Sequence, residues 1–485
     1  MPLILPGNVT TATAATAYSI ANSCRFNEPD SPAMSRGSIS ATNRRTWTFS
    51  YWIKRVQTTA RPSGAVGTMN HWNQGANDGS DDTVCLFWGA AEGDYLQTWE
   101  SVSDSFTYKF NTKMAFRDLA SWYHIVLACD TTQGTEANRF KIYINGTLLV
   151  AADFETANYP AENLETLVNS TNDMRIGKQY NNRYIDGYLA EFAFIDGTAY
   201  AASDFGEFDS DSPNMWKPKD LDGLTFGTNG FWLDFEDSSA LGNDVSGNNN
   251  DFTPANLAAV DQATDTPTNN FATLNPLNNY WAAVSFTEAN CVYTSNNTSD
   301  YLGFATSTLG VSKGRWYFEA KTSTASGTDI VGISSRNMTS RTTWLGSRTQ
   351  EYGYYQDNGE IRSNSADTSY GQTYTVNDII GIYLDLEDNK MYVTDNGSIM
   401  NSGTGHSITA AASTDSGFYH FAVGDNGDST QVWQVNFGGC PAFAISSAVA
   451  DDNGYGSFEY SPNITGDSSA KSFYALCTKN IAEFG

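Results

Sequence analysis

The sequence has few positive charges, no long apolar run and few cysteines, and each shortage excludes a class of protein. Lysine and arginine total 27 against 54 aspartates and glutamates, so the formal net charge is −27. Because a surface this negative repels nucleic acid and anionic lipid, we expect no nucleic-acid partner. No apolar run approaches the ~20 residues that span a bilayer, so we expect no membrane insertion. The opening MPLILPGNV has no basic segment and predicts no Sec-type signal.

The six cysteines are scattered and have neither a C-x-x-C pair nor a histidine at metal-ligand spacing: Cys24, Cys85, Cys129, Cys291, Cys440 and Cys477. We expect ordinary buried thiols, and the alternative is one or two disulfides in an extracellular setting. Heptads and collagen-like repeats are also missing, so the chain has no sequence for a fibrous shaft.

What the chain does contain is typical of β-structure. Only 17% of its residues are charged, 13% are aromatic, and 41 are glycines. Residues 46–54 alternate strictly, with four large apolar side chains on one face: Trp47, Phe49, Tyr51 and Ile53. This pattern predicts a half-buried strand. Asn145-Gly146 predicts a tight hairpin turn, and many such short strands predict an all-β fold of antiparallel sandwiches. A length of 485 residues allows two to four domains.

Several motifs follow one another in the first half of the chain. A W-x-H strand lies at 121–126, a hairpin with Asn-Gly at 141–146, Arg175-Ile176-Gly177 comes next, and Asp186-Gly187 precedes Glu191. In this order they resemble the laminin-G-like branch of the concanavalin A-like lectin/glucanase superfamily. The resemblance implies a jelly roll of two packed antiparallel sheets, which we place at residues 21–255. Residues 256–283, rich in proline, asparagine and threonine, are predicted to be a linker.

The second half carries a different set of motifs. They are G-R-W-Y-F-E at 314–319, D-I-V-G-I-S at 329–334, Y-G-Y-Y at 352–355, a strand at 378–386 whose hairpin ends in D-N-G at 395–397, and F-Y-H-F-A-V-G at 418–424. Their order resembles a SPRY domain, which implies a second concanavalin A-like sandwich at residues 284–440. Residues 1–20 are then an N-terminal arm, and residues 441–485 are a C-terminal extension.

The two ends of the chain resemble virion proteins of tailed bacteriophages. The cues are the opening MPLILPGNV, followed by ANSCRFN, and the ending YALCTKNIAEFG. The resemblance implies a fibre, spike or tip protein at the surface of the phage particle, assembled in the host cytoplasm, with host-surface glycan and other virion proteins as partners. It also implies a homotrimer. One alternative is a purely structural head-decoration or tail component that binds no sugar, and another is a glycan depolymerase.

Two sets of residues are candidates for sugar binding, because aromatic rings beside amides and carboxylates suit the faces and hydroxyls of a sugar. The first is a loop made of Tyr180, Asn181, Asn182, Arg183 and Tyr184. The second lies in the other sandwich, at Trp344, Tyr352, Tyr354, Tyr355, Gln356 and Asp357. The alternative is that these rings fill a core or an interface between subunits.

A dense run of oxygen-bearing side chains after residue 236 is a candidate calcium site, since calcium binds six to eight oxygens. Its members are Asp237, Asn243, Asp244, Asn248, Asn250 and Asp251. The spacing is not that of an EF-hand, however. The alternative is a polar turn in which these side chains cap their own backbone.

Catalysis has little support in the sequence. The retaining glucanases of this superfamily carry E-x-D-x-E on one strand, and the nearest strings here are Asp234-Phe235-Glu236 and Asp385-Leu386-Glu387. The four histidines, His71, His124, His406 and His420, follow no G-x-S-x-G elbow, and the chain has no P-loop. We therefore expect a binding protein and not an enzyme.

Overall fold

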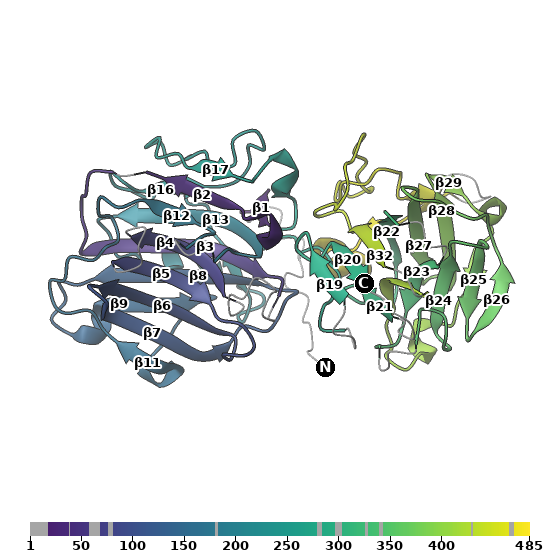
Figure 1. Cartoon of the computed structure of the whole chain (residues 1–485), viewed down its shortest axis with the longest axis horizontal. Coiled ribbons are helices and arrows are strands. Elements are labelled where there is room, and N and C mark those ends of the chain that lie inside the picture. Colours follow the sequence, from purple (N-terminus) through teal and green to yellow (C-terminus); the bar gives the residue numbers. More distant parts are fainter. Residues whose placement is uncertain are drawn as a thin grey trace. The chain divides into compact units, whose positions relative to one another are not determined.

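The computed structural model describes residues 18–37, 39–57, 68–75, 81–179, 183–278, 284–295, 303–324, 328–338, 343–427, 430–464 and 470–485. The chain divides into two compact units between Thr268 and Asn269. Nearly every element in the described ranges is a strand, and the one α-helix among them is α1 (Thr478–Phe484) (Figure 1). This confirms the all-β prediction.

The first unit contains two antiparallel sheets of eight strands each. Sheet A has the order β10 (Thr147–Leu148), β9 (Phe140–Ile144), β8 (Trp122–Asp130), β3 (Thr46–Arg55), β13 (Gly187–Asp196), β1 (Ser23–Phe26) and β18 (Gln262–Ala263), with β16 (Phe231–Leu233) beside β13. Sheet B has the order β11 (Phe154–Asn158), β7 (Ser105–Ala115), β6 (Tyr95–Val102), β5 (Asp82–Phe87), β4 (Met69–Gly75), β12 (Met174–Ile176), β2 (Ala33–Arg36) and β17 (Thr253–Ala255).

The core of this unit lies between the inner faces of sheets A and B. Strand β3 supplies the four side chains that the alternation predicted, Trp47, Phe49, Tyr51 and Ile53, and all of them are fully buried. The hairpin at Asn145-Gly146 is also confirmed, because both residues have the positive φ that this turn requires and the turn joins β9 to β10.

Strand β3 is buried on both faces, which the prediction of a half-buried strand did not foresee. Its outer neighbours Thr48 and Ser50 are 0% and 2% exposed. The cover is a segment that contains β14 (Gly206–Phe208) and β15 (Trp216–Pro218) and packs Phe205, Leu221 and Phe226 against the outer face of sheet A. A period-two pattern reports one buried face and cannot show that a distant segment buries the other.

The predicted linker at 256–283 is not a free connection. Its first part belongs to the first unit, where β18 pairs with β1 and Asp265 forms a buried ion pair with Lys54, Oδ2 to Nζ 2.7 Å. Residues 269–278 belong to the second unit, where Leu274 lies in the core and Phe271 forms a β-bridge with Cys477. The composition predicted a linker, whereas the carboxylate of Asp265 is buried within the first unit and pairs with Lys54.

The second unit is also a pair of antiparallel sheets. Sheet C has the order β19 (Val284–Thr287), β20 (Val292–Ser295), β32 (Gln431–Asn436), β22 (Arg315–Thr322), β27 (Ile379–Asp385), β28 (Lys390–Asp395) and β29 (Ser398–Ile399), with β30 (His406–Ser407) beside β28 and β35 (Tyr474–Ala475) beside β22. Sheet D has the order β21 (Gly303–Thr306), β31 (His420–Asp425), β23 (Asp329–Ser334), β24 (Glu351–Tyr355), β25 (Glu360–Ser363) and β26 (Ala366–Ser369).

The C-terminal extension is part of this second unit. Strand β35 adds to β22 in parallel, and Phe458 and Phe473 pack on Tyr317 and Tyr383 against the outer face of sheet C. Glu319 fastens the same segment. Its Oε1 accepts hydrogen bonds from Tyr317 Oη and the amide of residue 460, at 3.0 and 2.8 Å, and its Oε2 accepts from Asn436 and the amide of residue 459, both at 3.0 Å.

All six cysteines are buried as thiols, as the sequence predicted. Within the described ranges, no helix has both the length and the apolar character needed to cross a membrane.

Glu100, Glu191 and Glu319 are three of the four glutamates that are buried in the described residues; the fourth, Glu351, pairs with Arg348. Burial raises the pKa of Glu191 to about 8, and it raises the pKa of Glu100 and of Glu319 to about 7. The cause is the same in each case, because a charged carboxylate loses its hydration inside the protein.

These shifts predict that the protein is less stable in mild alkali than in mild acid. A raised pKa contributes stability that is complete below the usual pKa of 4.5 and is lost as the pH rises through the folded value. We expect the midpoint of thermal unfolding to fall between about pH 5 and about pH 9, and to fall less in Glu191→Gln. An unfolding midpoint that rises over this interval would contradict the burial argument.

Candidate functional site

The first predicted binding loop is described only at its base. Tyr180, Asn181 and Asn182 lie outside the described residues. At the base, Lys178 and Tyr184 form a β-bridge, and the amide of Gln179 donates to the carbonyl of Arg183 at 3.0 Å. Nζ of Lys178 lies 5.2 Å from the centre of the Tyr184 ring, and Arg183 and Tyr184 are both half-buried.

A hydrogen-bonded ladder ties this loop to the outer face of sheet B. Gln179 Nε2 donates to Asp82 Oδ2 at 3.1 Å, and the amide of Asn73 donates to Asp82 Oδ1. Arg175 Nη1 then donates to Asn73 Oδ1 at 3.0 Å. The inner neighbours of these residues lie in the core, as Trp72 does, so alternation places Asp82, Asn73 and Arg175 on the outer face.

The pKa of the Asp82 carboxyl is raised. Burial raises its pKa to about 6, although the hydrogen bonds from Gln179 and Asn73 and the charge of Arg175 act in the opposite direction. The hydrogen bonds of the ladder therefore fix the position of the Asp82 carboxyl at the base of the 178–184 loop.

The same face continues across three more strands toward an exposed aromatic pair. Cross-strand register places Asn73 opposite Val84, Val84 opposite Trp99, and Trp99 opposite Lys109. Directly opposed residues of neighbouring strands are in contact distance. From β12 to β7 the row crosses four strand spacings, about 19 Å.

The aromatic pair is Trp99 and Phe106, which meet edge to face with 5.7 Å between ring centres. Phe106 is 55% exposed, and Nζ of Lys109 lies 4.4 Å from the centre of its ring. Beside them Gln97 Nε2 donates to Asn111 Oδ1 at 2.7 Å. We call Trp99, Phe106 and Lys109 the sheet B platform; the ladder of Asn73, Asp82 and Arg175 borders it but is buried.

Sequence reasoning did not find this platform. The signal was present, because 95–102 and 105–115 are alternating strands whose polar face carries Trp99 and Lys109. The bordering residues Asn73 and Arg175 come from strands far away in the sequence, however, and only the sheet order brings them into one row.

The second predicted set of ligand residues is mainly core. Tyr352 and Tyr354 are 6% and 0% exposed and lie in the core between sheets C and D, so their assignment to a ligand surface is wrong. Their hydroxyls bond inside the unit: Tyr354 Oη donates to the carbonyl of Gln372, and Tyr352 Oη lies 3.1 Å from Thr409 Oγ1. Tyr352 and Tyr354 fill the core, which was the alternative considered for them.

The other members of that set differ in exposure. Tyr355 is buried on the outer face of sheet D in a cluster with Leu345, and the half-buried Trp344 packs against it. The guanidinium of Arg362 covers the Tyr355 ring at 4.0 Å. Gln356 is 5% exposed, whereas Asp357 is exposed. The sequence of β24 does not distinguish a ligand surface from a buried one, because a covering loop packs on aromatic rings just as a ligand does.

The candidate calcium loop uses its oxygens to hold its own backbone. Asp244 Oδ1 accepts the amides of Trp232 and Ser246, both at 2.9 Å, and its Oδ2 accepts the amide of Asn250 at 2.8 Å. The side-chain amides of Asn248 and Asn250 donate to carbonyls of a neighbouring loop. The acceptor oxygens of Asp244 thus already face three N–H donors, the arrangement of a capping turn and not of a cation site.

The remaining members of that loop follow the same pattern. Asp251 accepts the amide of Asp244, Asp237 accepts the amide and hydroxyl of Ser239, and Asn243 is exposed. No three His, Cys, Asp or Glu side chains of the described chain are grouped so that they could hold a metal ion. The calcium hypothesis is therefore not supported.

This loop predicts that a chelator has no effect on stability. An ion bound to the native state would raise the unfolding midpoint, so its removal would lower it. We expect EDTA to change the midpoint of thermal unfolding by less than about 1 °C. If EDTA lowers the unfolding midpoint and added calcium, but not magnesium, restores it, the loop binds calcium.

The carboxylates of the two motifs Asp234-Phe235-Glu236 and Asp385-Leu386-Glu387 form ion pairs or hydrogen bonds with nearby groups. Asp385 is buried and pairs with Lys471 at 2.9 Å and with Arg315 at 3.1 Å, and Glu387 accepts the amide of Gly314. Asp234 accepts the amide of Glu236, its partner in the other string.

A serine and a histidine are in contact, but with the proton in the wrong place for catalysis. Ser50 Oγ and His124 Nε2 are 2.9 Å apart, and Trp216 Nε1 donates to His124 Nδ1 at 2.9 Å. Because Nδ1 accepts a hydrogen bond from the indole N–H of Trp216, the neutral ring carries its own proton on Nε2, and this N–H donates a hydrogen bond to Ser50 Oγ. Burial lowers the pKa of His124 to about 3, so the ring is neutral. In this tautomer His124 cannot take the proton of Ser50.

Comparisons with known families agree with the two units. The concanavalin A-like lectin/glucanases superfamily matches residues 31–202, and the SPRY domain family matches residues 315–439. The chain carries a concanavalin A-like domain followed by a SPRY domain. A comparison with curated proteins found no match.

Several solved structures are similar to a part of this chain. The SPRY domain of human HERC1 is 15% identical and covers 35% of this chain and 97% of its own, with a TM-score of 0.27. A heptameric SAP-like pentraxin from Limulus polyphemus is 15% identical and covers 38% of this chain and 80% of its own, also with a TM-score of 0.27. A human SPRY domain is 18% identical and covers 33% and 96%, with a TM-score of 0.25.

Proposed function

We propose that this protein is a non-enzymatic attachment protein of a tailed bacteriophage, a fibre, spike or tip component on the virion surface that recognises host-surface glycan. The tandem lectin-like domains are compatible with binding, and the motifs at the two ends of the chain supply the resemblance to phage virion proteins. Other virion proteins are its proposed partners, and a homotrimer is its proposed assembly.

The observation that carries the glycan proposal is the sheet B platform. A sugar ring offers a flat C–H face that packs on an aromatic ring, and the exposed Phe106 beside Trp99 provides such a surface. Hydroxyls at the rim of the sugar need donors and acceptors. Lys109 and the Gln97–Asn111 amide pair lie next to the rings and supply such groups. The exposed part of the row, at Trp99, Phe106 and Lys109, suits one or two sugar units stacked on the rings.

The first testable consequence concerns Trp99 and Phe106. We expect Trp99→Ala and Phe106→Ala each to weaken binding of the host polysaccharide by about tenfold, because each removes a stacking surface. The measurement is a glycan array with the full chain, followed by titration of the best polysaccharide.

The matched control is Phe418→Ala, which removes a 44% exposed phenylalanine from the SPRY unit and should leave the affinity unchanged. If the protein binds no host polysaccharide, the structural head-decoration or tail role replaces this proposal. Release of shortened sugar chains would instead support the depolymerase.

A further inference from the structure

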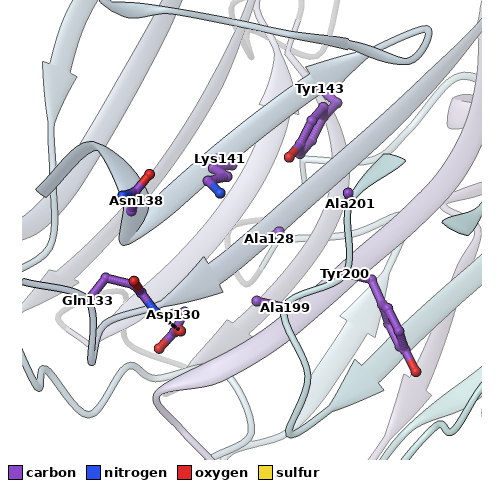
Figure 2. Close-up of a pocket in the computed structure, with 9 residues that line it drawn as sticks. All are labelled: Ala128, Asp130, Gln133, Asn138, Lys141, Tyr143, Ala199, Tyr200 and Ala201. Atoms are coloured by element: carbon purple, nitrogen blue, oxygen red, sulfur yellow. Dashed lines mark hydrogen bonds between the residues drawn. The ribbon is translucent and has the colours of Figure 1, made fainter. Parts of the chain in front are cut away.

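A pocket lies in the same unit as the sheet B platform, on the outer face of sheet A. Its volume is about 270 Å³, and it is lined by Ala128, Asp130, Gln133, Asn138, Lys141, Tyr143, Ala199, Tyr200 and Ala201. Figure 2 shows the three alanines between a polar group, formed by Asp130, Gln133, Asn138 and Lys141, and the two tyrosines. The platform described above belongs to sheet B, so the two sites are separate.

The floor of this pocket comes from paired strands. Ala128 of β8 lies directly opposite Lys141 of β9, and Tyr143 is two residues further along the same face. A small side chain at 128 leaves space beside the long stem of Lys141. The opposite wall is the chain at 199–201, which is held by Thr48: its Oγ1 donates to the carbonyl of residue 198 at 2.8 Å and accepts the amide of Tyr200 at 2.9 Å.

The polar wall is equally fixed. Asp130 Oδ1 accepts the hydroxyl of Thr132 at 2.6 Å, and its Oδ2 accepts Gln133 Nε2 at 2.6 Å. Burial opposes ionisation of Asp130, but these hydrogen bonds outweigh it and lower the pKa of the carboxyl. Arg139 donates to the carbonyl of Gln133 at 2.7 Å and holds the turn. A wall built this way is ordered before a ligand arrives, which reduces the entropy cost of binding.

The groups left for a ligand are mainly hydrogen-bond donors. Within the described residues, the ammonium of Lys141 has no ion-pair or hydrogen-bond partner, although the chain has twice as many acidic as basic residues. The hydroxyl of Tyr143 and the side-chain amide of Asn138 make no hydrogen bond within the described residues either, although the backbone N–H of Asn138 donates to the carbonyl of Thr135. Lys141 and Tyr143 are half-buried, so their polar ends are partly desolvated. A ligand that offers acceptors, above all a negatively charged one, fits this set.

We propose that this pocket binds an acidic monosaccharide unit, a sugar carboxylate such as a uronic acid. Its carboxylate pairs with Lys141, and its hydroxyls bond to Tyr143, Asn138 and the remaining lone pairs of Asp130. A single sugar ring fits a pocket of about 270 Å³.

The test is a titration of the full chain with sodium D-glucuronate and, separately, with D-glucose, in which saturation-transfer NMR measures binding. We expect D-glucuronate to bind at least about tenfold more tightly than D-glucose, because a charge-assisted hydrogen bond is worth about a factor of ten or more. Lys141→Gln should remove that preference, and Tyr143→Phe should weaken binding of both sugars. Lys113→Gln, an equal change of charge at an exposed lysine of sheet B, should change nothing.

Equal affinity for the two sugars, no saturation by D-glucuronate, or an equal effect of Lys113→Gln would each overturn the proposal. The platform variant Trp99→Ala separates it from the proposed function. We expect Trp99→Ala to bind D-glucuronate normally. If wild type binds D-glucuronate but no host polysaccharide, only the proposed function fails, and if it binds polysaccharide but not D-glucuronate, only this inference fails.

Discussion

Asp265→Ala is expected to destabilise the first unit by about 3–5 kcal/mol, because it leaves the ammonium of Lys54 buried without its carboxylate. The side chains of Lys54 and Asp265 are 0% and 1% exposed, and Asp265 also accepts the indole N–H of Trp122 at 3.2 Å. The pair joins β3 to the segment that precedes the second unit. Urea unfolding, read as the free energy of unfolding, is the measurement.

The matched control is an exposed pair. Arg45 and Glu165 are 42% and 47% exposed, and Glu165→Ala should cost less than about 1 kcal/mol because water screens the pair. The double variant Lys54→Met/Asp265→Leu should recover most of the loss, since apolar residues of similar volume often replace a buried ion pair without cost. If Asp265→Ala costs no more than Glu165→Ala, residues 256–268 are a linker after all.

Glu319→Ala is expected to cost about 3 kcal/mol or more in the second unit, because it removes the shared acceptor of four hydrogen bonds. Two of the four donors are backbone amides of the C-terminal extension. We therefore expect the extension to loosen from sheet C before the whole unit unfolds. Hydrogen exchange of the amides at 456–464 and limited proteolysis should report this loss.

The conservative control is Glu319→Gln, which keeps one acceptor oxygen and turns the other position into a donor. It should cost less than Glu319→Ala and should loosen the amide that meets the new donor. Loss of protection spread evenly over the unit, and not concentrated at 456–464, would contradict this account of how the extension is held.

Much of the fold could be predicted because the alternation of apolar residues along a strand shows which side chains face the core. Residues 46–54 predicted which four side chains enter the core, and Asn145-Gly146 predicted its hairpin, since both depend on neighbours within a few residues. The same reasoning misjudged Tyr352 and Tyr354. Alternation cannot show whether a ring faces a ligand, a covering loop or another sheet.

The candidate sites were less predictable than the fold. The base of the 178–184 loop borders a polar ladder, but the ladder needs Asp82 from β5, Asn73 from β4 and Arg175 from β12, which meet only through cross-strand register. The oxygen-rich turn around Asp244 shows the opposite case. Its composition suggested a cation, and its geometry assigns the same oxygens to backbone amides.

The sequence by itself determined the β-class, the two sandwiches, the buried thiols and the acidic surface, because periodicity, turn residues and composition act locally or sum over the whole chain. Only the tertiary structure decided which aromatic rings are exposed, where the two units divide and which polar side chains share a face. Those outcomes depend on the order of strands in each sheet and on the segments that cover it, which bring together residues more than a hundred positions apart.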